Sequence, residues 1–295
     1  MTYLAYRAGA AVALALPERL TGPGAGLLGG VLGLAMRGRR TMLARHLVRV
    51  HGPGMGESEL NRAVNQAFRS YARYWLEIFR LPRESPESLD RGIAVEGFEH
   101  VEAATAGGQG LLFVTPHLGN WDLGGAWMAA AGFRPATVME ALEPPELFEW
   151  FCSYRRRLGM EVVPLGDGAG SAMLRALRDG RIVGLLSDRD LSGTGVEVVF
   201  FGERTTLPAG PATLALRAGV DIMAATLLFD GPHRHRLIFR PPVRVGREGR
   251  LREDIARITQ TLADELELLV RLAPEQWHLL QPNWPSDFEA VAVER

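Results

Sequence analysis

The chain has 295 residues and a formal net charge of −1, so it can bury a sizeable core in one large domain or in a domain with an appendage. This balance of charge argues against a general nucleic-acid binder. The single cysteine, Cys152, excludes an intrachain disulfide framework and a cysteine-rich zinc site, and it fits a reducing, cytoplasmic compartment. All 33 basic residues are arginines, whose planar guanidinium groups suit carboxylate or phosphate partners.

Two short apolar runs, 8–16 and 26–36, lie near the N-terminus. Neither reaches the roughly 20 apolar residues that a membrane-spanning helix needs. We expect two short helices, which either pack on the domain as ordinary core helices or lie in a membrane interface. We assign residues 1–40 to membrane-interface helices and residues 41–295 to the main domain.

The pattern from 39 to 80 is helical, and Pro82 ends it. After it, short apolar runs alternate with helical patterns, which predicts an α/β fold with a mixed, largely parallel central sheet flanked by helices. The expected strands are 110–115, 136–139, 161–165, 182–186, 196–201, 222–229, 237–240 and 243–245. The expected helices are 120–131, 146–158, 171–179, 208–217 and 251–272.

The most informative segment runs from Thr115 to Asp122, where an expected strand ends and a helix begins. Ligands usually bind at this position on an open α/β sheet. His117 in the loop and Asp122 in the first helical turn can meet, so that the carboxylate holds one ring nitrogen and the other accepts a proton. Gly119 allows a tight turn, and Asn120 can cap the helix. By itself this spacing also fits a loop histidine beside a helix-capping aspartate, with no catalytic role.

The segment resembles the H-x-G-N-W-D motif of the lysophospholipid acyltransferase superfamily, in the branch of lipid A late acyltransferases and actinobacterial phosphatidylinositol mannoside acyltransferases. The similarity covers nearly the whole chain. It includes 69–75, Arg155 within 154–160, Asp188 to Leu191, 195–198, 200–202, 208–211 and the tail segments 273–278 and 281–284.

This resemblance implies a glycerolphosphate-acyltransferase-like fold in which His117, oriented by Asp122, acts as the general base. Glu197 matches the acidic residue of the family's third motif and would hold Arg155 or the sugar. Asp188 and Asp190 compete with Glu197 for that role. We also expect Asn120, Asp188 and Arg189 to contact substrate, together with Arg155 and Glu197.

The resemblance further implies transfer of a palmitoyl-type chain from acyl-CoA to a mannose hydroxyl of a phosphatidylinositol mannoside. The expected protein is peripheral, on the cytoplasmic face of the plasma membrane, and has acyl-CoA as co-substrate without a metal, another cofactor or a nucleic-acid partner. One alternative is a lipid A acyltransferase that uses acyl carrier protein and a Kdo-containing acceptor. Another is a non-catalytic lipid carrier or membrane-binding protein.

Other polar residues favour simpler interpretations. No G-x-S-x-G segment is present, which favours direct acyl transfer over an acyl-enzyme. We interpret His233 and His235 as exposed residues at a hairpin tip, and His278 as a residue that packs the C-terminal tail.

Overall fold

A computed structural model describes residues 2–293. Its strands are β1 (Ile93–Glu96), β2 (Leu111–Thr115), β3 (Pro135–Met139), β4 (Glu161–Pro164), β5 (Ile182–Leu186), β6 (Val196–Phe200), β7 (Glu203–Leu207), β8 (Ile222–Phe229) and β9 (His235–Phe239). The helices before the first strand are α1 (Thr2–Ala15), α2 (Thr21–Ala35), α3 (Arg37–His51), α4 (Glu57–Arg80) and α5 (Pro86–Gly92). The later helices are α6 (Phe98–Thr105), α7 (Trp121–Ala130), α8 (Pro145–Arg157), α9 (Ala169–Arg178), α10 (Gly210–Ala218), α11 (Leu251–Leu272) and α12 (Pro285–Val293).

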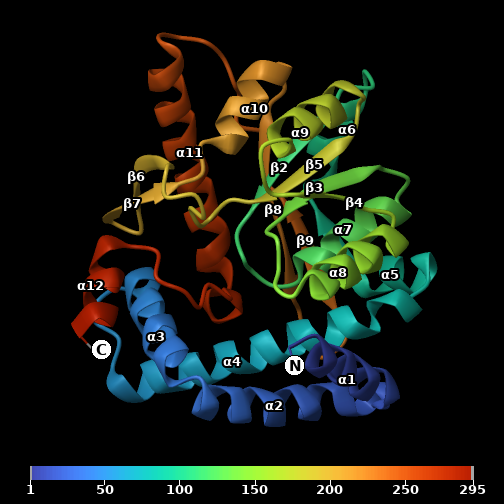
Figure 1. The fold of residues 1–295 in the computed structure, drawn as a ribbon, viewed down its shortest axis with the longest axis vertical. Helices are drawn as coiled ribbons and strands as arrows, with labels where there is room; N and C mark the ends of the chain where they lie inside the picture. Colours follow the sequence, from blue (N-terminus) through green and yellow to red (C-terminus); the bar gives the residue numbers. More distant parts are fainter. Residues whose placement is uncertain (1, 294–295) are drawn as a thin grey trace.

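Within the described residues, seven strands form one sheet in the order β1-β9-β8-β2-β5-β3-β4, while β6 and β7 form a separate hairpin. Every pair of neighbours in the sheet is parallel except β8 and β9. Helices flank the sheet (Figure 1). Buried side chains of β2 and β8 pack against α11 on one side of the sheet, whereas α7 and α8 contribute to a second apolar cluster. The predicted fold class is therefore confirmed.

The structure differs from the sequence-based prediction in several places, including the short helices α5, α6 and α12, which were not predicted. The helical segment 39–80 is two helices, α3 and α4, because the chain leaves the helix at Gly52 with φ of 91°. The expected strand 243–245 is only an isolated bridge between Val243 and Ile222. Two strands were not predicted: β1 has four residues at the sheet edge, and β7 is polar and half exposed.

The N-terminal helices pack along α4 at the lower edge of the molecule in Figure 1. A Cβ placed on Gly29 of α2 would lie 2.7 Å from the Cα of Arg69, so only glycine permits this close approach. Arg83 donates a hydrogen bond of 2.8 Å to the carbonyl of Leu14 in α1. None of the helices in residues 2–293 combines the length and apolar character needed to cross a membrane. The boundary at residue 40 stays a prediction.

The C-terminal tail returns from α11 to the carboxyl edge of β2 and β8. Gln276 hydrogen-bonds the backbone of Phe229 in both directions, at 2.8 and 3.0 Å. Further along, the buried Asp287 pairs with His46 at 3.1 Å and Arg49 at 2.8 Å, both from α3. These contacts hold the tail against β8 and α3.

Candidate active site

His117 and Asp188 meet at the carboxyl edge of the sheet. Strands β2 and β5 are parallel neighbours in which Thr115 lies opposite Leu186. Each of the two residues lies two positions beyond these strand ends, and the Nδ1 of His117 lies 2.6 Å from Oδ1 of Asp188. The backbone N–H of His117 also donates to Oδ2 of Asp188 at 2.8 Å. Neighbouring strands thus bring together two residues that are 71 positions apart.

The carboxylate of Asp188 is fully buried and is hydrogen-bonded by His117 and Trp277. The indole N–H of Trp277 donates to Oδ2 at 2.8 Å, and the amide of Asn283 donates to the backbone carbonyl of Asp188 at 3.0 Å. Burial by itself would raise the pKa of Asp188, but the His117 charge and the hydrogen bonds from His117 and Trp277 outweigh it and lower the pKa below its ordinary value. Asp188 is therefore held as a carboxylate.

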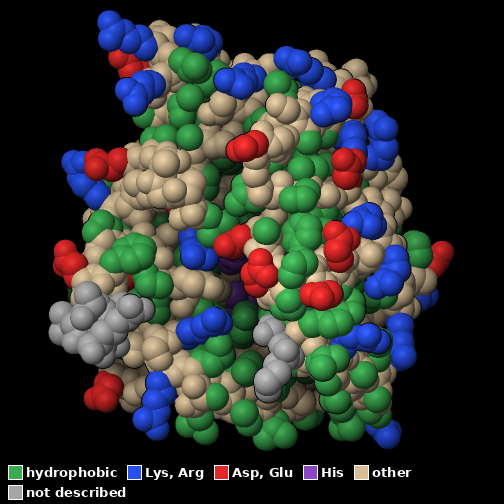
Figure 2. Space-filling model, viewed as in Figure 1, with side chains coloured by type: hydrophobic (Ala, Val, Ile, Leu, Met, Phe, Trp, Pro, Cys, Tyr) green, Lys and Arg blue, Asp and Glu red, His purple; other side chains and the backbone are tan. Residues whose placement is uncertain are grey.

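The His117 side chain is 28% exposed, so its ring can reach a bound molecule. With Nδ1 on Asp188, Nε2 has no hydrogen-bond partner among the described residues. The Trp121 ring packs edge-on against the imidazole, with 5.4 Å between centroids. In Figure 2 the face of the molecule is hollowed near its middle, with a histidine side chain at the floor and acidic and basic side chains around it.

Asp122 does not contact His117, and the prediction that it holds the imidazole is wrong. Its side chain points from the first turn of α7 into the core, where Arg155 of α8 donates to it from Nε at 2.6 Å and from Nη2 at 3.2 Å. Tyr74 of α4 donates a third hydrogen bond of 2.8 Å. Burial would lower the pKa of Arg155, yet the Asp122 carboxylate raises it. The pair therefore joins α7 and α8 as a buried ion pair.

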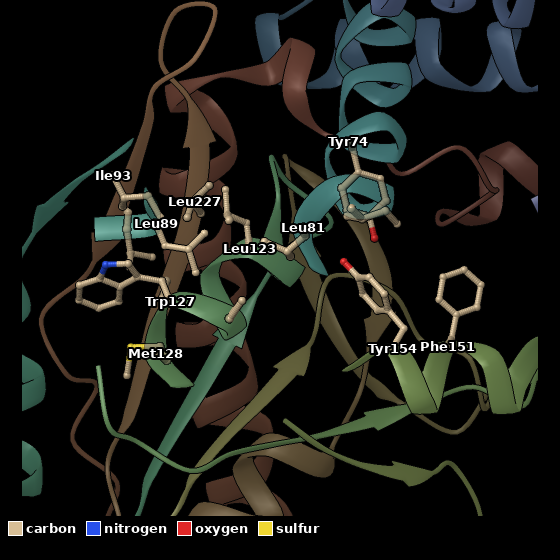
Figure 3. Packing of buried hydrophobic residues seen from close by; sticks show 14 of the residues in the cluster. Tyr74, Leu81, Leu89, Ile93, Leu123, Trp127, Met128, Phe151, Tyr154 and Leu227 are labelled. Carbon is tan, nitrogen blue, oxygen red and sulfur yellow. The ribbon is translucent and has the colours of Figure 1, made fainter. Parts of the chain in front are cut away.

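A second tyrosine stands beside this ion pair. The hydroxyls of Tyr74 and Tyr154 point toward one another in Figure 3. The Tyr154 hydroxyl is buried and has no hydrogen-bond partner in the described chain. Burial and the nearby Asp122 charge raise the pKa of both tyrosines well above its ordinary value, so both hydroxyls stay protonated.

The loop between His117 and α7 is shaped by its own backbone. Gly119 has φ of 64°, and a Cβ there would lie 1.9 Å from the carbonyl oxygen of Leu227, so glycine is required. The Asn120 carbonyl caps α7 through the N–H of Leu123 at 3.1 Å, as predicted. Its amide donates to Glu77 at 2.9 Å. Because Asn120 is buried and both ends of its side chain are engaged, neither is directed at a substrate.

Glu197 does not hold Arg155, which is a second correction. Along β6 the residues Val198 and Phe200 face the core, so Glu197 faces outward and pairs with Arg204 of β7. Its side chain is 65% exposed. The alternation of the strand thus directs this carboxylate into solvent.

The other residues of the Asp188 segment have separate environments. Asp190 accepts hydrogen bonds from the backbone of Ser192, Gly193 and Gly195 and shapes the following loop. Arg189 is half-buried and forms no hydrogen bond or ion pair within residues 2–293. Among the three competing acidic residues, only Asp188 contacts His117.

Two histidines outside the motif are also placed by the structure. His235 lies in β9 rather than in an exposed loop, and its Nε2 is 2.9 Å from Glu77. His278 packs in the tail as expected, with Nε2 2.9 Å from the hydroxyl of Ser70. Burial, with a smaller effect of the His117 charge, lowers the pKa of His278 to about 3, so it is neutral at physiological pH.

Sequence reasoning missed the contacts of Tyr74 and Trp277. No role was predicted for Tyr74, although its hydroxyl donates a hydrogen bond to Asp122. A buried tryptophan usually needs a partner for its indole N–H, and this rule could have directed attention to Trp277. Nothing local in the sequence identifies that partner as Asp188.

The fold and site together define an α/β protein whose histidine–carboxylate pair lies where such sheets bind ligands. The family model for bacterial lipid A biosynthesis acyltransferases matches residues 1–286. The chain belongs to this family.

Curated relatives cover most of the chain. A phosphatidylinositol mannoside acyltransferase of Mycobacterium tuberculosis is 38% identical over 96% of this chain and 88% of its own length. The protein of that name from Mycolicibacterium smegmatis is 36% identical over 97% of this chain and 92% of its own length. A lipid A biosynthesis acyltransferase of Haemophilus influenzae is 24% identical over 89% of this chain and 80% of its own length.

Proposed function

We propose that this protein transfers a long, palmitoyl-type acyl chain from acyl-CoA to a mannose hydroxyl of a phosphatidylinositol mannoside. The acceptor is suggested by the two mycobacterial relatives. Both are named phosphatidylinositol mannoside acyltransferase, and they are 36–38% identical to this chain over nearly its whole length. The observation that carries the chemistry is the 2.6 Å contact between His117 and Asp188, which leaves Nε2 available as a base.

In this mechanism Nε2 of His117 takes the proton of the sugar hydroxyl as its oxygen attacks the thioester carbonyl. The carbon–sulfur bond breaks, and the thiolate leaves and recovers the proton from the imidazolium. The buried Asp188 carboxylate stabilises the imidazolium charge and keeps the proton of the neutral ring on Nδ1. A general base of this kind typically contributes about 10²- to 10⁴-fold to the rate. No acyl-enzyme is needed, because the acceptor oxygen attacks directly.

A lipid acceptor requires a membrane-facing surface, and α1 and α2 have the side chains for one. Figure 2 shows hydrophobic side chains gathered at the lower edge, over the position of these helices in Figure 1. Leu27 is 75% exposed, Leu34 is 79% exposed and Val31 is 55% exposed, all on α2. Such apolar faces bind the membrane interface without crossing it.

A cavity of about 300 Å³ beside α1 adds positive charge to this surface. Its apolar lining includes Phe79 and Trp150, and its charged lining consists of Arg7, Arg83 and Arg157. Arginines beside apolar side chains suit the headgroup region of anionic lipids. These features support a peripheral position on a membrane surface, which we assign to the cytoplasmic face of the plasma membrane.

The substrate assignment is tested by supplying radiolabelled palmitoyl-CoA and purified phosphatidylinositol mannosides to the full-length protein. We expect labelled, alkali-labile acylated mannoside. In a parallel reaction the protein receives palmitoyl–acyl carrier protein and a Kdo-containing lipid A precursor. If product forms only in the parallel reaction, the acyl-transfer mechanism stands, but the assignment of acyl-CoA and phosphatidylinositol mannoside as substrates is wrong.

The membrane assignment is tested with liposomes of anionic phospholipid. We expect the double variant Leu27→Glu, Leu34→Glu to lose its binding to liposomes and no longer float with them, because it places charges on the apolar face of α2. Both side chains are exposed, so the substitutions leave the core intact. Leu251→Glu in α11 is the control, since Leu251 is also exposed, at 42%, but lies outside α1 and α2. Equal flotation of all three proteins would overturn the assignment.

A further inference from the structure

The C-terminal tail forms part of the site, although the acyl-transfer chemistry assigns it no role. The N–H of Gly119 donates to the carbonyl of Gln276 at 2.9 Å, and the N–H of His278 donates to the carbonyl of His117 at 2.6 Å. Between them, Trp277 forms an antiparallel bridge with Leu118. The tail therefore runs beside the His117 loop as an additional strand-like segment.

Trp277 is placed by this segment directly behind the histidine–carboxylate pair. Its side chain is 1% exposed, and its indole N–H donates to Oδ2 of Asp188 at 2.8 Å. Oδ1 of the same carboxylate lies 2.6 Å from Nδ1 of His117. The indole ring packs against Phe201, with 5.5 Å between centroids, and against His46 at 5.6 Å. The indole thus cannot turn away from Asp188 without disturbing the core.

We propose that Trp277 is a positioning residue that fixes the Asp188 carboxylate so that Oδ1 addresses the imidazole of His117. The proposal rests on the proposed function, in which that imidazole is the base. The indole N–H also withdraws negative charge from the carboxylate, because it donates a hydrogen bond to the ionised form. Without this donor the carboxylate holds the imidazolium more strongly, so the base is protonated at higher pH and is less well oriented.

The charged and titratable groups around the pair define what a pH measurement reports. Asp188, which follows β5, contacts both His117, which follows β2, and the indole of Trp277 in the tail. His278, also from the tail, lies close enough for the His117 charge to affect it but has a pKa of about 3. His46 of α3 faces the other side of the indole and pairs with Asp287. A measurement at the His117 ring itself therefore distinguishes this residue from the neighbouring histidines.

The tail provides a matched control in Trp284. It is also fully buried and donates its indole N–H, but to the backbone carbonyl of Phe200 at 3.1 Å. Trp277→Phe and Trp284→Phe thus remove the same group from the same segment, and only the first removes a donor to Asp188. Replacement of Trp277 by 3-benzothienylalanine removes the N–H with almost no change in ring shape, which keeps the test valid if Trp277→Phe does not fold.

The variants are compared in acyl transfer from palmitoyl-CoA to phosphatidylinositol mannoside, over pH 5 to 9. For both changes at Trp277 we expect kcat to fall roughly tenfold, as for loss of one hydrogen bond to a charged group. We also expect the acidic limb of the kcat profile to move up by as much as about 1 pH unit, with KM nearly unchanged. Trp284→Phe should keep the wild-type profile. A wild-type kcat and pH profile in the benzothienylalanine protein would overturn the proposal.

An NMR titration of the His117 ring separates this inference from the proposed function. The folded protein is labelled with ¹⁵N-histidine, and the His117 signals are assigned with His117→Gln. We expect the Trp277 changes, and not Trp284→Phe, to raise the titration midpoint without any substrate present. An unchanged midpoint would refute the influence of Trp277, even if transfer to phosphatidylinositol mannoside is absent.

Discussion

Asp188 binds the imidazole of His117 with one carboxylate oxygen, at 2.6 Å, and the backbone N–H of the same residue with the other, at 2.8 Å. This two-point contact fixes the ring relative to its own backbone. Because Nδ1 is engaged with the carboxylate, Nε2 is the nitrogen left for a bound molecule. The contact depends on β2 and β5 being parallel neighbours, with Thr115 opposite Leu186.

Substitution of Asp188 by Asn removes the charge that stabilises the imidazolium. The amide N–H of Asn can also donate to Nδ1 of His117, which favours the tautomer that carries its proton on Nε2. We expect kcat to fall about 10²- to 10⁴-fold, while substrate binding changes little. Steady-state kinetics at several pH values checks this, with a thermal melt to confirm folding. The control is Glu197→Gln, which changes an exposed side chain of β6 and should leave kcat at the wild-type value.

Substitution of Asp122 by Asn should act mainly on stability. The change leaves the Arg155 guanidinium buried without its charge partner and weakens the hydrogen bond from Tyr74. Losing one partner of a buried pair typically costs about 3–5 kcal/mol. Denaturant unfolding measures the loss. A free energy of unfolding equal to that of wild type, with activity abolished, would indicate that Asp122 acts in the chemistry instead.

His278 makes the stability dependent on pH. Its pKa is about 3 in the folded protein and about 6.5 when unfolded, so between these values only the unfolded chain binds the proton. Stability from this group is complete above pH 6.5 and falls by roughly 1.4 kcal/mol per pH unit as the pH drops below it. We expect His278→Gln to flatten the decrease in unfolding free energy between pH 6.5 and 4. An identical slope in the variant would contradict this origin.

Two adjacent glycines of α2 test the packing of the N-terminal helices. Gly29→Ala places a Cβ 2.7 Å from the Cα of Arg69 and should lower the melting temperature, because the backbones of α2 and α4 must separate. Gly30→Ala meets nothing within 4 Å and should raise stability by about 0.5–1 kcal/mol through its helix propensity. Thermal melts of the two variants compare the effects, and melting temperatures that change in the same direction would contradict the packing.

The strongly periodic elements were predictable from sequence. The apolar runs of β5 and β8 and the amphipathic α11 have the bounds that their patterns indicated. The edge strand β1 and the polar strand β7 lack such a pattern, because neither is buried on both faces. The break between α3 and α4 is marked in the sequence by Gly52, Pro53 and Gly54, so it could have been predicted.

The site was predictable in its residues but not in its pairing. His117 follows a recognisable strand and motif, whereas its carboxylate partner depends on which strand lies beside β2, and sequence order does not give this. Asp122 is the nearer carboxylate in sequence, but the helical turn directs it toward Arg155 and away from His117. The tail contact of Trp277 spans 89 residues and arises only in the folded chain.

The most direct test of the account is acyl transfer from radiolabelled palmitoyl-CoA to phosphatidylinositol mannoside by wild type and by His117→Ala at equal concentration. Circular dichroism and thermal melts establish that the variant is folded. We predict that the folded variant loses at least about 10²-fold in rate, because no other group replaces Nε2 as the base. Transfer by the folded variant at the wild-type rate would contradict the assignment of His117 as the base.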